Sequence, residues 1–224
     1  MPRIFLAGPM FSGADLAAQS RLRTVMVKAG YDTYLAQLDG LEQRSLVELM
    51  LKPGVASPEF EKAVATLQRI GWCHEMYQIF ISDGLVFNMN GRVPDEGAVV
   101  EAATAFAFGI PVVTFKDTTI SMWGAGDNPM VAALDRTWKP TKRLGDLPAA
   151  MKKALAARSK GYKYEPPQHL RESIEFGKEI APKVKTLVAN MKVAARKGEL
   201  ATTLAAIHSD VGSMRKLVNA LLAL

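Results

Sequence analysis

The sequence predicts an α/β protein with a parallel sheet, and two features carry this prediction. Short apolar runs over residues 85–87 and 111–115 alternate with helical patterns such as 59–81. A short apolar run between turn signals is typical of a strand buried on both faces. Strands that alternate with helices imply right-handed crossovers, and therefore a parallel sheet. The 224 residues are enough for one such domain plus an appendage.

The first part of the chain is predicted to run strand, helix, strand. Residues 3–7 form an apolar run that ends at Gly8-Pro9. A helical pattern follows residues 12–15, and Asp15 is expected to be its N-cap because its carboxylate can accept a backbone N–H of the first turn. A second strand is predicted over residues 31–36, and a short helix over 46–51.

The remainder of the domain is expected to alternate in the same way. The predicted elements are a long helix over residues 59–81, a strand over 85–87, a helix over 97–108, a strand over 111–115, and short helices over 130–134 and 147–157. Gly109 and Pro111 end the second of these helices, since glycine caps helix C-termini and proline cannot continue a helix.

The C-terminal quarter is predicted to be a separate helical extension. Residues 159–167 have the composition of a linker, with one glycine and two adjacent prolines. Residues 168–197 and 199–222 have amphipathic helical patterns that are expected to form an antiparallel hairpin. The predicted organisation is an α/β domain over residues 1–158, the linker, and a hairpin extension over 168–224.

The positive charge is concentrated in this extension. Residues 1–150 hold 14 lysines and arginines against 16 acidic residues, and residues 151–224 hold 14 against 6, so the net charges are −2 and +8. The basic residues of the tail alternate with apolar ones at helical spacing and form no dense run. We therefore interpret them as a solvated helix face, which argues against nucleic acid as a partner.

Composition excludes several classes of protein. A single cysteine, Cys73, cannot form an internal disulfide, and three scattered histidines with no ligand motif indicate no metal site. No apolar stretch approaches the ~20 residues of a membrane span, and the N-terminus lacks a signal-peptide core. A cytoplasmic protein without a membrane partner is expected.

The loop over residues 88–97 is the predicted site, because it leaves the carboxyl end of a strand, where open α/β sheets place ligands. Glu101 follows it and is the one ionisable residue between Ala98 and Phe115. An ionised carboxylate among apolar residues is costly unless it is paired or functional. The alternative is that Glu101 lies on an exposed stripe, but Ala105 and Phe108 stand where such a stripe needs polar residues.

Asp95 precedes the same helix, and Gly97 lets the backbone turn closely at the helix start. Both Asp95 and Glu101 can then face one crevice. Paired carboxylates suit glycosyl chemistry, in which one attacks an anomeric carbon and the other binds hydroxyls or supplies a proton. Asp95 could equally be an N-cap that contacts no ligand.

Four segments together resemble the nucleoside 2-deoxyribosyltransferases. The segments are Ile4-Phe5-Leu6-Ala7-Gly8-Pro9-Met10-Phe11, Asp83-Gly84-Leu85-Val86, Asp95-x-Gly97-x-x-x-Glu101, and Trp123-Gly124-Ala125-Gly126-Asp127-Asn128. The resemblance covers roughly residues 3–140 and not the tail. It implies a flavodoxin-like parallel sheet flanked by helices and a role in nucleotide salvage.

The resemblance also implies catalytic roles. Glu101 would attack C1′ of the deoxyribose to form a glycosyl-enzyme ester, and Asp95 would bind sugar hydroxyls. The carboxylate that protonates the departing base would be Glu75 or Asp83. Many members carry tyrosine in the first strand, where this chain has Phe5. Either another hydroxyl substitutes for it, or the nucleophile is more basic.

Further residues are expected to contact the substrate. The loop Gly8-Pro9-Met10-Phe11 is neither a P-loop nor a dinucleotide motif, so backbone N–H donation beside the sugar is its expected use. Met10 and Phe11 could form a wall against the base or simply pack in the core. The other candidates are Gly97, Asp39 in a second carboxyl-end loop, Arg92 in the site loop, and Asn128, which the resemblance assigns to the site of an adjacent subunit.

The predicted function is transfer of 2-deoxyribose between nucleobases, in a homo-oligomer with shared sites and without cofactor or metal. The expected partners are nucleosides and free bases, with the nucleoside favoured over the 5′-monophosphate. Two rivals remain open. An N-glycoside hydrolase would use the same Glu101 and pass the sugar to water, whereas a nucleoside-binding module would catalyse nothing.

Overall fold

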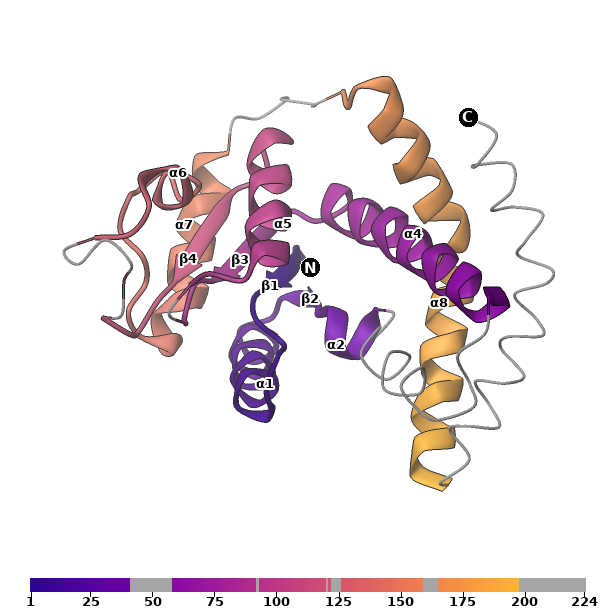
Figure 1. Ribbon diagram of the computed structural model, residues 1–224. Coiled ribbons are helices and arrows are strands. Elements are labelled where there is room, and N and C mark those ends of the chain that lie inside the picture. The colour runs from indigo at the N-terminus through magenta and orange to yellow at the C-terminus, as the bar shows by residue number, and fades with distance from the viewer. Residues whose placement is uncertain (41–57, 92, 120, 122–125, 159–164, 198–224) are drawn as a thin grey trace.

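A parallel β-sheet forms the centre of the computed structural model (Figure 1). The structure describes the chain except residues 41–57, 92, 120, 122–125, 159–164 and 198–224. Within this part, one sheet of four strands has the order β2-β1-β3-β4, and every pairing is parallel. The strands are β1 (Arg3–Ala7), β2 (Asp32–Tyr34), β3 (Gly84–Asn88) and β4 (Val112–Phe115). The predicted α/β fold class is confirmed.

Helices cover both faces of the sheet (Figure 1). The helices are α1 (Gly13–Lys28), α2 (Ala36–Asp39), α4 (Pro58–Phe80), α5 (Glu96–Ala107), α6 (Pro129–Ala132), α7 (Leu147–Ala157) and α8 (Gln168–Lys197), with a 3-10 turn at Leu144–Asp146. Alternate residues of each strand point to opposite faces. Phe5 and Phe87 therefore pack with α4 and α5, whereas Ile4 and Val86 pack with α1 and α7.

Two predicted boundaries are wrong by a few residues. Helix α1 begins at Gly13, and its N-cap is Ser12, whose hydroxyl accepts from the backbone N–H of Asp15. Asp15 instead returns a bond to the backbone N–H of Ser12, which completes a capping box. Strand β2 stops at Tyr34, because α2 begins at Ala36. The helix expected over residues 46–51 lies outside the described residues.

The first helix of the tail packs against α4 of the same chain. Helix α8 packs against α4, and its buried apolar residues are Ile174, Phe176, Ile180 and Val184. Gly177 marks the close approach, since a Cβ atom there would lie 2.0 Å from the carbonyl oxygen of Cys73. The second predicted tail helix, over residues 199–222, lies outside the described residues. In the described part of the chain, no helix is long and apolar enough to cross a membrane.

Candidate active site

Glu75 and Glu101, two of the predicted catalytic residues, interact where α4 and α5 pack together. Burial raises the pKa of Glu75 to about 7 and the pKa of Glu101 well above its usual value. The negative charge of Glu75 raises the pKa of Glu101 further. Two carboxyls of which one, once charged, opposes the ionisation of the other hold one proton between them over a range of pH. The pair can therefore offer one carboxylate and one carboxylic acid at the same time.

Asp95 lies beside this pair and also caps α5. Its Oδ1 accepts from the backbone N–H of Gly97 at 3.0 Å, as expected for an N-cap. Burial raises the pKa of Asp95, and its charge adds to the forces that raise the pKa of Glu101. The sequence left open whether Asp95 caps the helix or belongs to the site. The two roles are compatible, because the carboxylate that caps α5 also influences the pKa of Glu101.

Tyr34 brings a hydroxyl to the site that the sequence did not predict. Its Oη donates a hydrogen bond to Oε1 of Glu75 at 2.7 Å, and the side chain is 2% exposed. Tyr34 lies opposite Phe5 in the ladder between β1 and β2, with ring centroids 5.1 Å apart. The neighbouring strand β2 therefore provides a tyrosine hydroxyl, whereas Phe5 on β1 has none.

A line of hydrogen bonds continues behind Tyr34. The Tyr34 hydroxyl lies 3.3 Å from Nδ1 of His74, and Nε2 of His74 lies 3.0 Å from the side-chain nitrogen of Gln78. Oε1 of Gln78 accepts from the guanidinium of Arg3 at 2.7 Å. Burial, helped by the charge of Arg3, lowers the pKa of His74 to about 4, so its imidazole is neutral near pH 7.

Asp83, the other candidate for the acid that protonates the base, is not part of this cluster. It precedes β3 at the amino end of the sheet, and its Oδ2 accepts from the backbone N–H of Arg3 at 2.8 Å. The predicted site lies at the opposite ends of the strands. Of the two alternatives, the structure brings only Glu75 to Glu101, because Glu75 lies on α4, which packs against α5, whereas Asp83 follows α4 and precedes β3.

The loop after β1 packs tightly at the carboxyl end of the sheet. A Cβ atom on Gly8 would lie 2.2 Å from Nε2 of Gln19 and 2.7 Å from Cβ of Asn88, so only glycine fits between α1 and β3. Pro9 is buried and Met10 is partly buried, whereas Phe11 is 65% exposed. The exposed ring of Phe11 favours the binding interpretation over the core interpretation for that residue.

The remaining candidates have different surroundings. Asp39 accepts from the backbone N–H of Leu35 at 3.0 Å and pairs with Arg23 at 3.1 Å, and its charge raises the pKa of Glu75. Asn128 caps α6 by accepting from the backbone N–H of Met130 at 3.0 Å. The candidate Arg92 lies outside the described residues.

The loop that carries Asn128 is attached to the end of β4. Lys116 is 4% exposed and forms an ion pair with Asp127, the residue before Asn128. A buried lysine needs such a partner, because an unpaired charge is costly in a protein interior. The ion pair therefore holds the start of α6 near the carboxyl end of the sheet.

Sequence reasoning missed Tyr34 and His74, although a signal for Tyr34 was available. Tyr34 ends a strand whose carboxyl end lies at the predicted site edge, where ligand-contacting residues gather. His74 gave no comparable signal, because one histidine within a long helical pattern is typical of core packing. Within the described residues, no group of three His, Cys, Asp or Glu side chains could hold a metal ion.

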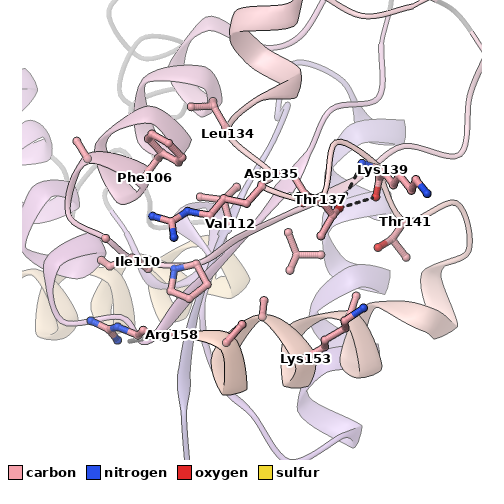
Figure 2. Close-up of a pocket in the computed structure, with 18 residues that line it drawn as sticks. Phe106, Ile110, Val112, Leu134, Asp135, Thr137, Lys139, Thr141, Lys153 and Arg158 are labelled. Carbon is pink, nitrogen blue, oxygen red and sulfur yellow. Dashed lines mark hydrogen bonds between the residues drawn. The ribbon is translucent and has the colours of Figure 1, made fainter. Parts of the chain in front are cut away.

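A cavity of about 660 Å³ lies elsewhere, beside β4 and between α5 and α7 (Figure 2). It combines apolar side chains such as Ile110 and Val112 with the cations Lys153 and Arg158. The carboxylate in its lining, Asp135, accepts hydrogen bonds from the backbone N–H groups of Thr114 and Thr137. None of the predicted site residues lines this cavity, so it is separate from the glutamate pair.

Comparison with known proteins agrees with the predicted family. The model of the nucleoside 2-deoxyribosyltransferase family matches residues 4–165. A solved structure of a conserved protein from Enterococcus faecalis V583 is 21% identical, with 68% of this chain and 98% of that chain covered and a TM-score of 0.48. A 2-deoxyribosyltransferase from the psychrotolerant bacterium Bacillus psychrosaccharolyticus is 18% identical, with 65% and 90% covered and a TM-score of 0.42. Among curated proteins, no sequence matches this chain.

Proposed function

Because the chain belongs to the nucleoside 2-deoxyribosyltransferase family, we propose that it moves 2-deoxyribose from one nucleobase to another through a covalent intermediate on Glu101. One observation carries the chemical part of this proposal. Glu101 and Glu75 form a partly buried pair in which the charge of one carboxylate disfavours ionisation of the other. Such a pair supplies both a nucleophile and an acid.

The first half-reaction uses both members of the pair. A carboxylate oxygen of Glu101 forms a bond to C1′ as the bond from C1′ to the base nitrogen breaks. Glu75 gives its proton to the departing base, which leaves as a neutral molecule. The reactive form of the pair carries one proton. Glu75 ionises first and its charge raises the pKa of Glu101, so the resting pair holds this proton mainly on Glu101, and the proton passes to Glu75 before the base departs. The products are the glycosyl ester of Glu101 and the carboxylate of Glu75.

The second half-reaction reverses these steps with a different base. The incoming base loses its N–H proton to the Glu75 carboxylate while its nitrogen attacks C1′ and the ester bond to Glu101 breaks. Proton and electron pair both return to their starting positions. The two half-reactions thus balance with the two carboxyls and the substrate alone.

The other candidate residues are assigned to binding in this proposal. Asp95, at the start of α5, would accept hydrogen bonds from sugar hydroxyls, and the loop from Gly8 to Phe11 would border the sugar and the base. Asp39 and Arg92 would contact the substrate, and Asn128 would serve the site of a neighbouring subunit. The ion pair between Lys116 and Asp127 attaches the segment before α6 to the end of β4, which supports a defined position for Asn128.

Incubation with one deoxynucleoside, with and without a free second base, tests the proposal. A new nucleoside that forms only with the second base is the expected product. Release of free deoxyribose with no exchange would establish a hydrolase instead, and absence of turnover would leave a nucleoside-binding protein. Chromatography of the reaction mixture distinguishes the three outcomes.

Ribonucleosides are expected to react much more slowly than deoxynucleosides. The electron-withdrawing 2′-hydroxyl destabilises the oxocarbenium-like transition state of glycosyl transfer. Initial rates with adenosine and deoxyadenosine measure this difference directly. Equal rates would contradict deoxyribosyl specificity and indicate an enzyme for ribosyl groups.

A further inference from the structure

We infer that Tyr34 is a positioning residue that directs the acid-base chemistry of Glu75, and that Arg3 sets its direction through Gln78 and His74. This inference rests on the proposed function, since it assigns a task to Tyr34 within that site. The observation behind it is the line of hydrogen bonds that joins the four side chains to Oε1 of Glu75.

The direction of every bond in this line follows from its first member. The guanidinium of Arg3 can only donate, so Gln78 must present its oxygen to Arg3 and its NH₂ group to His74. Nε2 of the neutral imidazole then accepts, and its proton lies on Nδ1. Nδ1 donates to the oxygen of Tyr34, whose own hydrogen is directed to Glu75.

The Tyr34 hydroxyl determines which oxygen of Glu75 can exchange a proton. Oε1 is occupied as an acceptor, so the proton of the acid form must lie on Oε2. Among the described residues, Oε2 is buried and has no hydrogen-bond partner. We therefore assign the transferable proton to Oε2, the oxygen that Tyr34 does not occupy.

The backbone at Gly40 fits against this hydrogen bond. A Cβ atom at Gly40 would lie 2.6 Å from Oη of Tyr34 and 3.0 Å from Oε1 of Glu75. A larger residue would push the two groups apart. Gly40, at the end of α2, thus leaves room for the hydrogen bond between Tyr34 and Glu75. His74 of α4 contacts the same Tyr34 hydroxyl from the other helix.

The hydrogen bond also strengthens Glu75 as an acid. When Glu75 gives up its proton, the bond from Tyr34 becomes charge-assisted and stabilises the carboxylate. It opposes burial and the charge of Asp39, which raise the pKa of Glu75. Glu101, from α5, is the other ionisable partner of Glu75, and Asp95 in turn acts on Glu101.

Replacement of Tyr34 by phenylalanine tests the inference. The Tyr34→Phe variant should raise the pKa of Glu75, the first of the two carboxyls to ionise, so the acid limit of the base-exchange rate should move up by about one pH unit. At the optimal pH, kcat should fall about tenfold while KM changes little. Tyr31→Phe is the matched control, because Tyr31 bonds instead to the carbonyl oxygen of Pro148 at 3.2 Å. An unchanged pH profile in Tyr34→Phe would overturn the inference.

A titration without substrate separates this inference from the proposed function. Carbon-13 NMR of labelled glutamates, with the Glu75 signal assigned by Glu75→Gln, measures the pKa of Glu75 directly. If the wild-type protein exchanges no bases, the proposed function fails, and the titration still decides the role of Tyr34. A Glu75 pKa that is the same in the wild type and Tyr34→Phe refutes that role.

A double-mutant cycle tests the directing role of Arg3 and Gln78. The Gln78→Met variant frees the tautomer of His74, so part of the Tyr34 hydrogen bonding is expected to turn from Glu75 to Nδ1. The pKa of Glu75 should rise in Gln78→Met, by less than in Tyr34→Phe. It should not rise again when Gln78→Met is added to Tyr34→Phe. If Gln78→Met raised the pKa of Glu75 equally in the wild type and in Tyr34→Phe, the effect would not pass through Tyr34, and the inference about Arg3 and Gln78 would be overturned.

Discussion

Glu75 of α4 and Glu101 of α5 act on each other across a helix junction, since the charge of Glu75 raises the pKa of Glu101. Neither residue can be assigned a protonation state without the other. Activity that needs one proton on the pair should fall at high pH, where both ionise, and at low pH, where both are protonated. The pH profile should therefore be bell-shaped, with a lower limb governed by Glu75, whose pKa is about 7, and an upper limb governed by Glu101, whose pKa is raised further by the Glu75 charge.

Loss of the Glu101 carboxylate should abolish the covalent route. Glu101→Ala is expected to lower base release on the order of 10³-fold or more, because the nucleophile and its reaction path are lost together. Mass spectrometry of quenched reactions should detect a sugar adduct on the wild-type protein and none on the variant. Glu96→Ala, at the exposed start of the same helix, is the matched control. Base release by Glu101→Ala above a few per cent of the wild-type rate would exclude Glu101 as the nucleophile.

Glu75 should cost stability at neutral and alkaline pH. Its folded-state pKa lies above that of an unfolded glutamate, so the native state binds more protons and the free energy of unfolding falls as pH rises from about 4.5 to about 7. The penalty is at most about 3 kcal/mol. Glu75→Gln should therefore raise the melting temperature more at pH 8.5 than at pH 5. Equal gains at both pH values would show that Glu75 is not desolvated in the native state.

Complementation between subunits tests the role of Asn128. Asn128→Asp keeps the oxygen that caps α6 but removes the NH₂ donor, so α6 should remain folded. If sites are shared, Asn128→Asp and Glu101→Ala chains should be weakly active alone and recover activity in mixed oligomers. Co-expression with two different tags and purification through both provides these oligomers. Oligomers of Glu101→Ala chains that carry both tags are the control. If the mixed oligomers were no more active than this control, Asn128 would not belong to a shared site.

Gly177 tests the contact between α8 and α4. Alanine is favoured over glycine within a helix by about 1 kcal/mol, so Gly177→Ala would stabilise an isolated α8. In the folded protein its Cβ atom would lie 2.0 Å from the Cys73 carbonyl oxygen and must push the helices apart. A net loss of about 1–3 kcal/mol in the free energy of unfolding is expected.

Gly145→Ala is the control for this substitution, because a Cβ atom at Gly145 has no neighbour within 4 Å. Thermal unfolding followed by circular dichroism compares the two variants. A higher melting temperature for Gly177→Ala than for the wild type would contradict the close helix contact.

Much of the fold was predictable from local pattern. Buried strands such as β3 and β4 need uninterrupted apolar runs, and a parallel sheet requires helices between them. Boundaries were less predictable, as Ser12 and Asp15 show, because either side chain can accept a first-turn N–H. The choice between them depends on where the chain leaves β1.

The amino-acid sequence by itself determined the fold class, the family, and the placement of Asp95 and Glu101 in one loop-helix segment. These depend on residues close together in the chain, whose relative positions follow from the geometry of one helix and one strand end. Only the tertiary structure brought Glu75, and not Asp83, to Glu101 and brought Tyr34 to Glu75. Those relationships depend on the register of β2 against β1 and on how α4 packs on the sheet, which no local pattern specifies.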